Sequence, residues 1–388
     1  MAKIESLDSV RGLAALIVVF WHFASAFYPA IAGGPAGVTH TRYDILVFRS
    51  PLSIIFAGNF AVVVFFVLSG FVLTIKFHLG QQKSLFAAAV KRYVRLMPIV
   101  LVSILFSYAI LTLGLMYFKP AGTLSGSPWL STGYFQFQPS LLDAISQGLL
   151  IVFVTPLSTN QAYNPLLWTI YYELLGSLLV FGLVSLGSGH SKRWMLYLIA
   201  SVGLINTYFC GFIIGAALAD LYANKHAIYD RIQYVSRVYR WALLVVALAI
   251  CAYPVAGDLG TNGKYWSMLT LFDSNLVTSR SIMELIAATI IIFLALSWLQ
   301  LKNLLEKKPL LWLGKISYSL YATHFMLLFS LSSRLMIALV HYFSYNLAAM
   351  LTGVISLPIM LGLAYLLHKY IEIPSIAIAN QVGDWAKS

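Results

Sequence analysis

Long apolar runs, separated by short polar segments, follow one another along nearly the whole chain. Most of them approach the roughly 20 residues that an α-helix needs to cross the hydrocarbon core of a bilayer. Because backbone groups find no water there, crossing segments of this length favour helices. The pattern predicts an all-α, polytopic transmembrane helix bundle with about ten spanning helices. The expected spans are 12–32, 54–76, 97–118, 165–187, 194–209, 209–223, 241–257, 282–300, 310–332 and 347–370.

The orientation of the bundle follows from its cations. Five Lys and Arg residues between positions 76 and 95 place that segment, and with it the N-terminus, in the cytoplasm. A further apolar segment at 140–156 is then expected to be re-entrant or interfacial, because a full crossing would put Lys192 and Arg193 outside. The fifth and sixth spans are short and favour a hairpin broken near the sequence INTY. Both termini are expected to be cytoplasmic.

Composition supports the membrane class. Of the 388 residues, 60% are hydrophobic and 10% charged, and the mean hydropathy is +0.84. The net charge of +12 does not require a nucleic-acid partner, since cations collect in cytoplasmic loops and bind anionic cofactors. One membrane domain is expected over 1–388, with its core at about 5–375. Cys210 and Cys251 lie in apolar runs, which predicts neither a disulfide framework nor a metal cluster.

The first span carries unusual polar residues. Its charge and an AIA sequence at 30–32 resemble a signal peptide, but its length of about 20 residues favours a retained helix. Arg11 and His22 are eleven residues apart, so they share one helix face about 16 Å apart along the axis. Asp8 lies one turn before Arg11 and can pair with it. The alternative is that Arg11 is a topology anchor and His22 a packed core residue.

Two further segments combine polar and small residues. In KRYVRLMP, residues 91–98, Arg92 and Arg95 share a helix face and can bind phosphate oxygens, or act only as a topology signal. Ser69 and Gly70 interrupt an apolar helix, where small residues allow a helix or a ligand to approach closely.

Later segments add titratable groups. Glu173 is a carboxylate inside an apolar helix, preceded by Trp168, and an intramembrane carboxylate is a functional-site candidate. Ser317, Tyr321 and His324 follow i, i+4, i+7 spacing and form a polar stripe on one face.

These segments together resemble membrane-bound acyltransferase family 3, the polysaccharide O-acyltransferases. The family's motifs are matched, in order, by LDSVRGLAALIVVFWH, FFVLSGF, RYVRLMP, LWTIYYE, SYSLYATH and KYIEIPS, which cover about residues 5 to 375. Thr169 stands where Ser is usual, and Ala322 with Thr323 where Leu is common. Neither change removes a titratable group.

The resemblance implies a function and a set of roles. Such proteins are thought to move an acyl group, usually acetyl, from cytoplasmic acyl-CoA to a hydroxyl of a glycan or lipid-linked acceptor. It implies an integral protein of the bacterial inner membrane, with acetyl-CoA as donor substrate and no permanently bound cofactor or metal. Catalysis is assigned to His22 and Glu173, donor binding to Arg11, Ser69, Arg92 and Arg95, and support to Asp8, Trp168, Tyr321 and His324.

Two chemical roles stay open for His22: general base on the acceptor hydroxyl, or nucleophile forming an acyl-imidazole. Glu173 is the better carboxylate to orient the imidazole, because Asp8 lies too near the cytoplasmic end. A transporter, in which buried His, Glu and Arg form an ion pathway, is the competing class. An inactive glycan-binding member is the third.

Overall fold

The computed structural model describes residues 4–81, 84–224, 236–251 and 276–385, without the side chains of 276–280. All regular structure in these ranges is helical, which confirms the all-α class. Six helical runs are long and apolar enough to cross a membrane, and a helix pair bent by 94° makes a possible seventh. The first three are α1 (Glu5–Phe27), α4 (Gly58–His78) and α5 (Leu85–Thr112). The other three are continuous runs: η4 (Pro165–Leu167) with α10 (Trp168–Gly187), α18 (Lys308–Leu327) with α19 (Ser333–Leu339), and α20 (Tyr345–Leu367) with α21 (Ile373–Trp385). The bent pair is α16 (Leu276–Ser297) and α17 (Leu299–Leu305).

The expected ten spans are not confirmed by the described residues. The fifth and sixth became α11 (Trp194–Gly203) and α12 (Phe209–Ala223), which have 10 and 15 residues. Helices of that length extend only about 15 and 22 Å, less than the roughly 30 Å of a bilayer core. They meet at the turn of the INTY sequence. The end of the expected span 241–257 lies outside the described residues, which include α14 (Arg237–Cys251).

α5 begins twelve residues earlier than the expected span 97–118. The Ser84 side chain accepts a hydrogen bond from the Ala87 backbone N–H and caps the helix there. Pro98 lies inside the helix. Arg92 and Arg95 therefore lie about two and three turns within α5 rather than ahead of it.

The segment 140–156 contains one helical run, Leu141–Val154, and the residues after it lead the chain back to the start of that run. It contains α8 (Leu141–Ser146), a π-helical turn (Gln147–Ile151) and α9 (Val152–Val154). Near its start, the Ser140 N–H donates to the Tyr163 hydroxyl at 2.8 Å, and in the middle of the run the Leu149 carbonyl accepts from Tyr93 Oη at 2.6 Å. This path agrees with a re-entrant segment.

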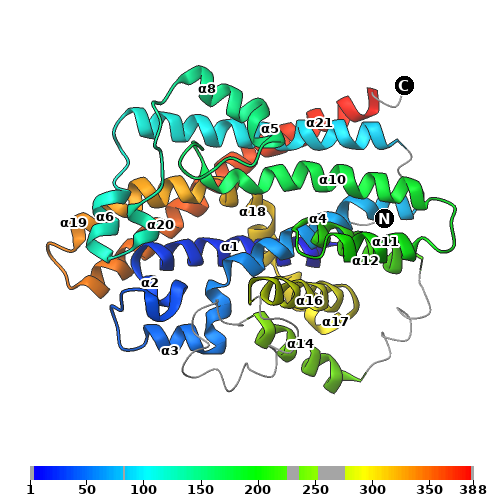
Figure 1. The fold of residues 1–388 in the computed structure, drawn as a ribbon, viewed down its shortest axis with the longest axis horizontal. Coiled ribbons are helices and arrows are strands. Elements are labelled where there is room, and N and C mark those ends of the chain that lie inside the picture. Colours follow the sequence, from blue (N-terminus) through cyan, green and yellow to red (C-terminus); the bar gives the residue numbers. More distant parts are fainter. Residues whose placement is uncertain (1–3, 82–83, 225–235, 252–275, 386–388) are drawn as a thin grey trace.

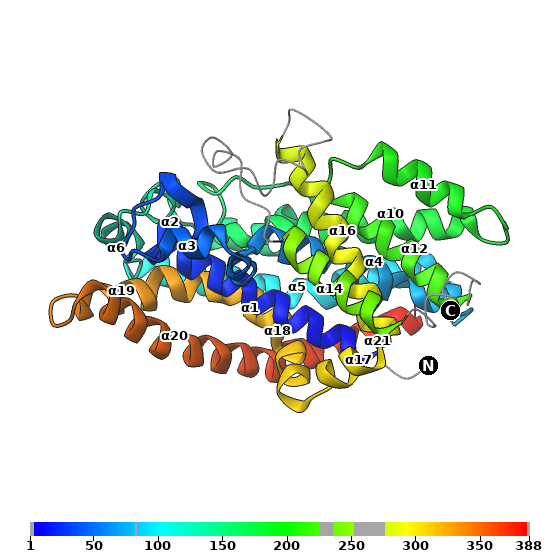
Figure 2. The same ribbon diagram turned by 90° about the horizontal axis from the view of Figure 1, so that it is seen from below.

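The long helices run roughly along one axis, with α1 at the centre between α4 and α18 (Figure 1). α4 packs along α12, α10 contacts α4 and α5, and α16 covers α1 and α4 on the side seen best in the turned view (Figure 2). α21 lies along α5, so that its last turn packs against the first turns of α5. The amino end of α1 and the carboxyl end of α21 lie at the same end of the bundle (Figures 1 and 2).

Glycines set the closest helix contacts. A Cβ on Gly12 would lie 2.5 Å from the backbone N of Gly314, so α1 and α18 touch backbone to backbone. A Cβ on Gly70 would lie 2.0 Å from the carbonyl oxygen of Phe212 in α12. Gly70 is thus required by a neighbouring helix, as the small-residue pattern predicted.

Replacing Gly70 with alanine is therefore expected to lower the free energy of unfolding by at least about 1–3 kcal/mol, because backbone cannot yield as a side chain does. Gly182→Ala in α10 is the matched control, since nothing lies within 4 Å of its added Cβ. Thermal unfolding in detergent measures both. Equal stability of the two variants would refute the packing argument.

Candidate active site

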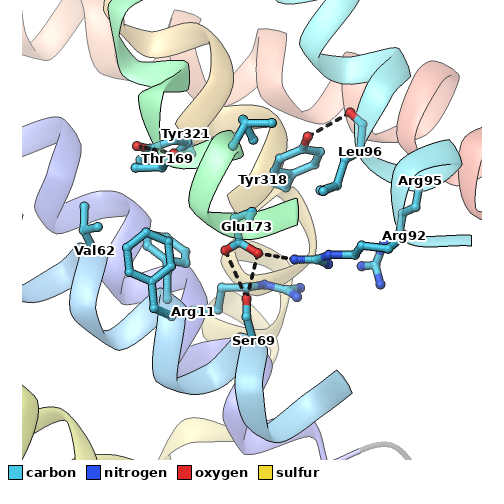
Figure 3. Close-up of a pocket in the computed structure, with 13 residues that line it drawn as sticks. Arg11, Val62, Ser69, Arg92, Arg95, Leu96, Thr169, Glu173, Tyr318 and Tyr321 are labelled. Carbon is cyan, nitrogen blue, oxygen red and sulfur yellow. Dashed lines mark hydrogen bonds and ion pairs between the residues drawn. The ribbon is translucent and has the colours of Figure 1, made fainter. Parts of the chain in front are cut away.

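A cavity lies between α1, α4, α5, α10 and α18, with about 650 Å³ of space between atoms. Aromatic and aliphatic side chains form much of its wall, and charged groups converge in the middle (Figure 3). Six residues singled out in the sequence line it: Arg11, Ser69, Arg92, Arg95, Glu173 and Tyr321.

Glu173 is at the centre of this cavity, and both oxygens of its carboxylate accept hydrogen bonds. Ser69 Oγ donates to both carboxylate oxygens, at 3.0 and 3.1 Å. The guanidinium of Arg92 forms an ion pair with the same carboxylate (Figure 3). The Arg92 Nε also donates to Ser177 Oγ at 3.1 Å. The pair is mostly buried, with 11% and 14% of the two side chains exposed.

The expected pairing of Glu173 with His22 is not found. Among the described residues, no hydrogen bond or ion pair joins the two, because α5 presents Arg92 directly to the carboxylate across from α10. A carboxylate in a poorly hydrated interior is stabilised far more by a touching cation than by a neutral ring. Glu173 therefore lines the cavity, and its partner there is Arg92 instead of the expected His22.

Arg11 is held on a second side of the cavity. Its pairing with Asp8 is confirmed, at 3.2 Å. Its Nε donates to Ser317 Oγ at 3.0 Å and its Nη2 to the Gly314 carbonyl at 3.1 Å. These bonds to α18 are possible because Gly12 and Gly314 let the two helices touch.

Arg95 differs from the other two arginines. In the described part of the chain its guanidinium makes no hydrogen bond or ion pair, although it lines this cavity and the one that adjoins it. The adjoining cavity shares Arg11 and Arg92 as well, and reaches the exposed side chains of Lys76 and Gln81 near the amino end of α1. Arg95 is thus a cation without a hydrogen-bond or ion-pair partner among the described residues, and it lies where the two cavities lead from the surface inward.

His22 lies beyond the cavity and pairs with a second histidine. Only 3% of its surface is exposed. Its Nδ1 lies 2.9 Å from the Val18 carbonyl and 3.1 Å from Nε2 of His324. His324, expected only to support the site, is the direct partner of His22.

The two ends of the predicted polar stripe on α18 contact α1, and its middle lines the cavity. Ser317 bonds Arg11, Tyr321 lines the cavity, and His324 bonds His22. The Tyr321 ring lies 6.2 Å from the His324 ring, between centroids, and its hydroxyl bonds Thr169 and the Leu166 carbonyl. Tyr321 therefore separates the inner end of the cavity from the histidine pair.

Two aromatic residues beside His22 were missed by the sequence analysis, and one supporting residue lies elsewhere. Trp129, in the short helix α7 (Pro128–Ser131), and Trp21 have ring centroids 5.4 and 4.5 Å from that of His22. Trp129 comes from a connection without periodic pattern, so no spacing pointed to it. Trp168 packs instead on Tyr172 and Tyr208, and it does not line the cavity.

The residues just before α10 explain how the helix is oriented so that Glu173 points into the cavity. Asn164 accepts a hydrogen bond from the Leu166 backbone N–H, and Pro165 starts the helical turn that leads into α10. The Asn164 amide also donates to Ser103 Oγ and to the Ala322 carbonyl, at 2.6 and 2.7 Å. These bonds fix the start of α10 to α5 and α18, and with it the direction of Glu173.

A family model described as an acyltransferase domain matches residues 4–369, nearly the whole chain. This protein is a multi-pass membrane protein with an acyltransferase domain. It belongs to acyltransferase family 3. Searches of curated proteins and of solved structures gave no match.

Proposed function

We propose that this protein is an O-acyltransferase that moves an acyl group, acetyl in the first instance, from cytoplasmic acyl-CoA to a hydroxyl of a glycan or another cell-envelope acceptor. The amino end of α1 faces the cytoplasm in this proposal, and the protein resides in the bacterial inner membrane. Acyl-CoA is a substrate, not a bound cofactor.

The observation that carries the proposal is the row of three guanidinium groups along one continuous path. Arg11 and Arg92 are neutralised by Asp8 and Glu173, while Arg95 remains without such a partner among the described residues. A guanidinium binds phosphate oxygens through two parallel N–H donors. The nucleotide end of acyl-CoA carries phosphates and fits the mouth of this path better than a proton or a metal ion does.

The distance from Arg11 to His22 suits the rest of the donor. A pantetheine arm that spans about 16 Å along α1 brings the thioester to the imidazole. The arm has to pass Tyr321 on its way. His22 then acts as general base on the acceptor hydroxyl, or as nucleophile through an acyl-imidazole.

Incubation of membranes with radiolabelled acetyl-CoA tests the function. Label is expected in a glycan or lipid fraction of the cell envelope, and not in membranes from cells without the protein. Absence of label in every envelope fraction, with the protein shown to be inserted, would contradict the proposal. Uptake of an ion without label transfer would favour the transporter class.

Arg95→Ala is expected to weaken acyl-CoA binding about ten-fold or more, since a charge-assisted hydrogen bond contributes about 1.5–3 kcal/mol and about 1.4 kcal/mol is ten-fold. Arg95→Lys is expected to recover only part, because an ammonium lacks the planar fork. A binding titration with purified protein measures both. Arg334→Ala, an exposed arginine of α19, is the control. If Arg95→Ala binds acyl-CoA with unchanged affinity, Arg95 acts only as a topology signal.

A further inference from the structure

A chain of hydrogen bonds runs through the two histidines from one helix backbone to the other. It starts at the Val18 carbonyl of α1, 2.9 Å from His22 Nδ1, and continues from there to His324 Nε2 at 3.1 Å. It ends where His324 Nδ1 lies 2.9 Å from the Leu320 carbonyl of α18. Both rings are almost fully buried, with 3% and 1% exposed.

These hydrogen bonds determine which ring nitrogens carry a proton when both histidines are neutral. A carbonyl oxygen can only accept, so Nδ1 of His324 carries a proton and its Nε2 is a free acceptor. Nδ1 of His22 also faces a carbonyl and so carries a proton, which it shares between Val18 and His324. The Nε2 lone pair of His22 is then the one without a proton, and no hydrogen bond of the described residues occupies it.

We propose that His324 is the proton acceptor that activates His22. This rests on the proposed acyl transfer. As the acceptor oxygen bonds to the thioester carbonyl carbon, its proton moves to His22 Nε2, while the Nδ1 proton of His22 moves to His324 Nε2. When the C–S bond breaks, the two transfers reverse, and the thiolate takes the proton from His22 Nε2. The products are the ester and free CoA thiol, and both histidines are neutral again.

His324 thereby takes the place of the carboxylate that was expected beside His22. In the described residues no carboxylate bonds either ring, and Glu173 is engaged by Arg92. The other titratable group near the pair on α18 is Tyr321, whose hydroxyl is bonded to Thr169. From the connection between α5 and α8, Trp129 faces His22, with Tyr134 behind it. The pair can share one positive charge over two rings where a single imidazolium would be poorly solvated.

The first experiment does not need acyl transfer. Diethyl pyrocarbonate ethoxycarbonylates an unprotonated imidazole nitrogen, and mass spectrometry of peptides follows each histidine. His324→Gln is the probe variant, because its amide oxygen can accept the Nδ1 hydrogen bond but cannot take the proton. Modification of His22 is expected to be at least about five-fold slower in His324→Gln than in the wild type. His341, an exposed histidine, is the internal control.

Equal rates at His22 in the two proteins, with equal rates at His341, would overturn the proposal. His324→Leu, which offers no acceptor, is expected to be slowed at least as much and replaces the glutamine variant if that one fails to insert. Slowed modification together with no acyl transfer by the wild type would refute the proposed function and leave the proton transfer standing.

The second experiment counts the moving protons. The rate of acyl transfer is measured in mixtures of H₂O and D₂O at saturating acyl-CoA. For the wild type, the transfer rate is expected to depend on the deuterium fraction along a curve, since two protons move. For His324→Gln, the dependence is expected to be linear, and kcat is expected to be lower by about ten-fold or more. The KM for acyl-CoA is expected to stay unchanged. A purely structural role for His324 would lower kcat without changing the curvature, and that result would overturn the proposal.

Discussion

His22→Ala is expected to abolish acyl transfer, with a loss of at least about 100-fold, because general acid–base catalysis contributes about 10²–10⁴-fold. The imidazole lies on α1 near its carboxyl end, and its Nε2 is free of hydrogen bonds within the described residues. Transfer of labelled acetyl from acetyl-CoA by purified protein measures the effect.

Alanine also leaves a cavity beside His324, so a second variant is needed. His22→Gln keeps a polar group near the Val18 carbonyl and His324, and it is expected to insert and elute as the wild type does while losing transfer. Near-normal transfer by either variant would restore the interpretation of His22 as a packed core residue. Label that stays on the wild-type protein when the acceptor is absent would identify the nucleophilic route.

Glu173→Ala is expected to destabilise the protein by about 3–5 kcal/mol, because it leaves the buried guanidinium of Arg92 without its counter-ion. Glu173→Gln keeps the hydrogen bond from Ser69 but loses the charge, so an intermediate loss is expected. The double variant Arg92→Met/Glu173→Leu removes both charges and is expected to recover most of the stability without recovering transfer.

Thermal unfolding in detergent and the transfer assay together measure these variants. Glu306→Ala serves as the control, because its ion pair with Lys302 is half exposed and is expected to contribute less than about 1 kcal/mol. A Glu173→Ala protein as stable as the wild type would contradict the buried ion pair. A double variant with full transfer would show that the pair has no part in the reaction.

The sequence by itself determined which segments are helical and which polar residues share a face of each helix. Apolar runs of near-membrane length give the all-helical class, and the period of 3.6 residues places Ser317, Tyr321 and His324 on one face. The same period explains the Asp8–Arg11 pair, whose two residues are one turn apart. Six motifs in family order gave the family that the comparison confirmed. All of these properties are local, or are repeated along the chain, and so can be read from spacing alone.

Only the tertiary structure decided which helix faces which. Glu173 meets Arg92 rather than His22, and His22 meets His324, because α1, α5, α10 and α18 pack at particular heights and rotations. Those positions depend on close contacts such as Gly12 against Gly314 and Gly70 against Phe212, between residues far apart in the chain. The short α11 and α12 and the early start of α5 depend likewise on caps and turns that hydropathy averages over. Hydrophobic spacing records that a face is buried, but it carries no information about the residue on the opposite side.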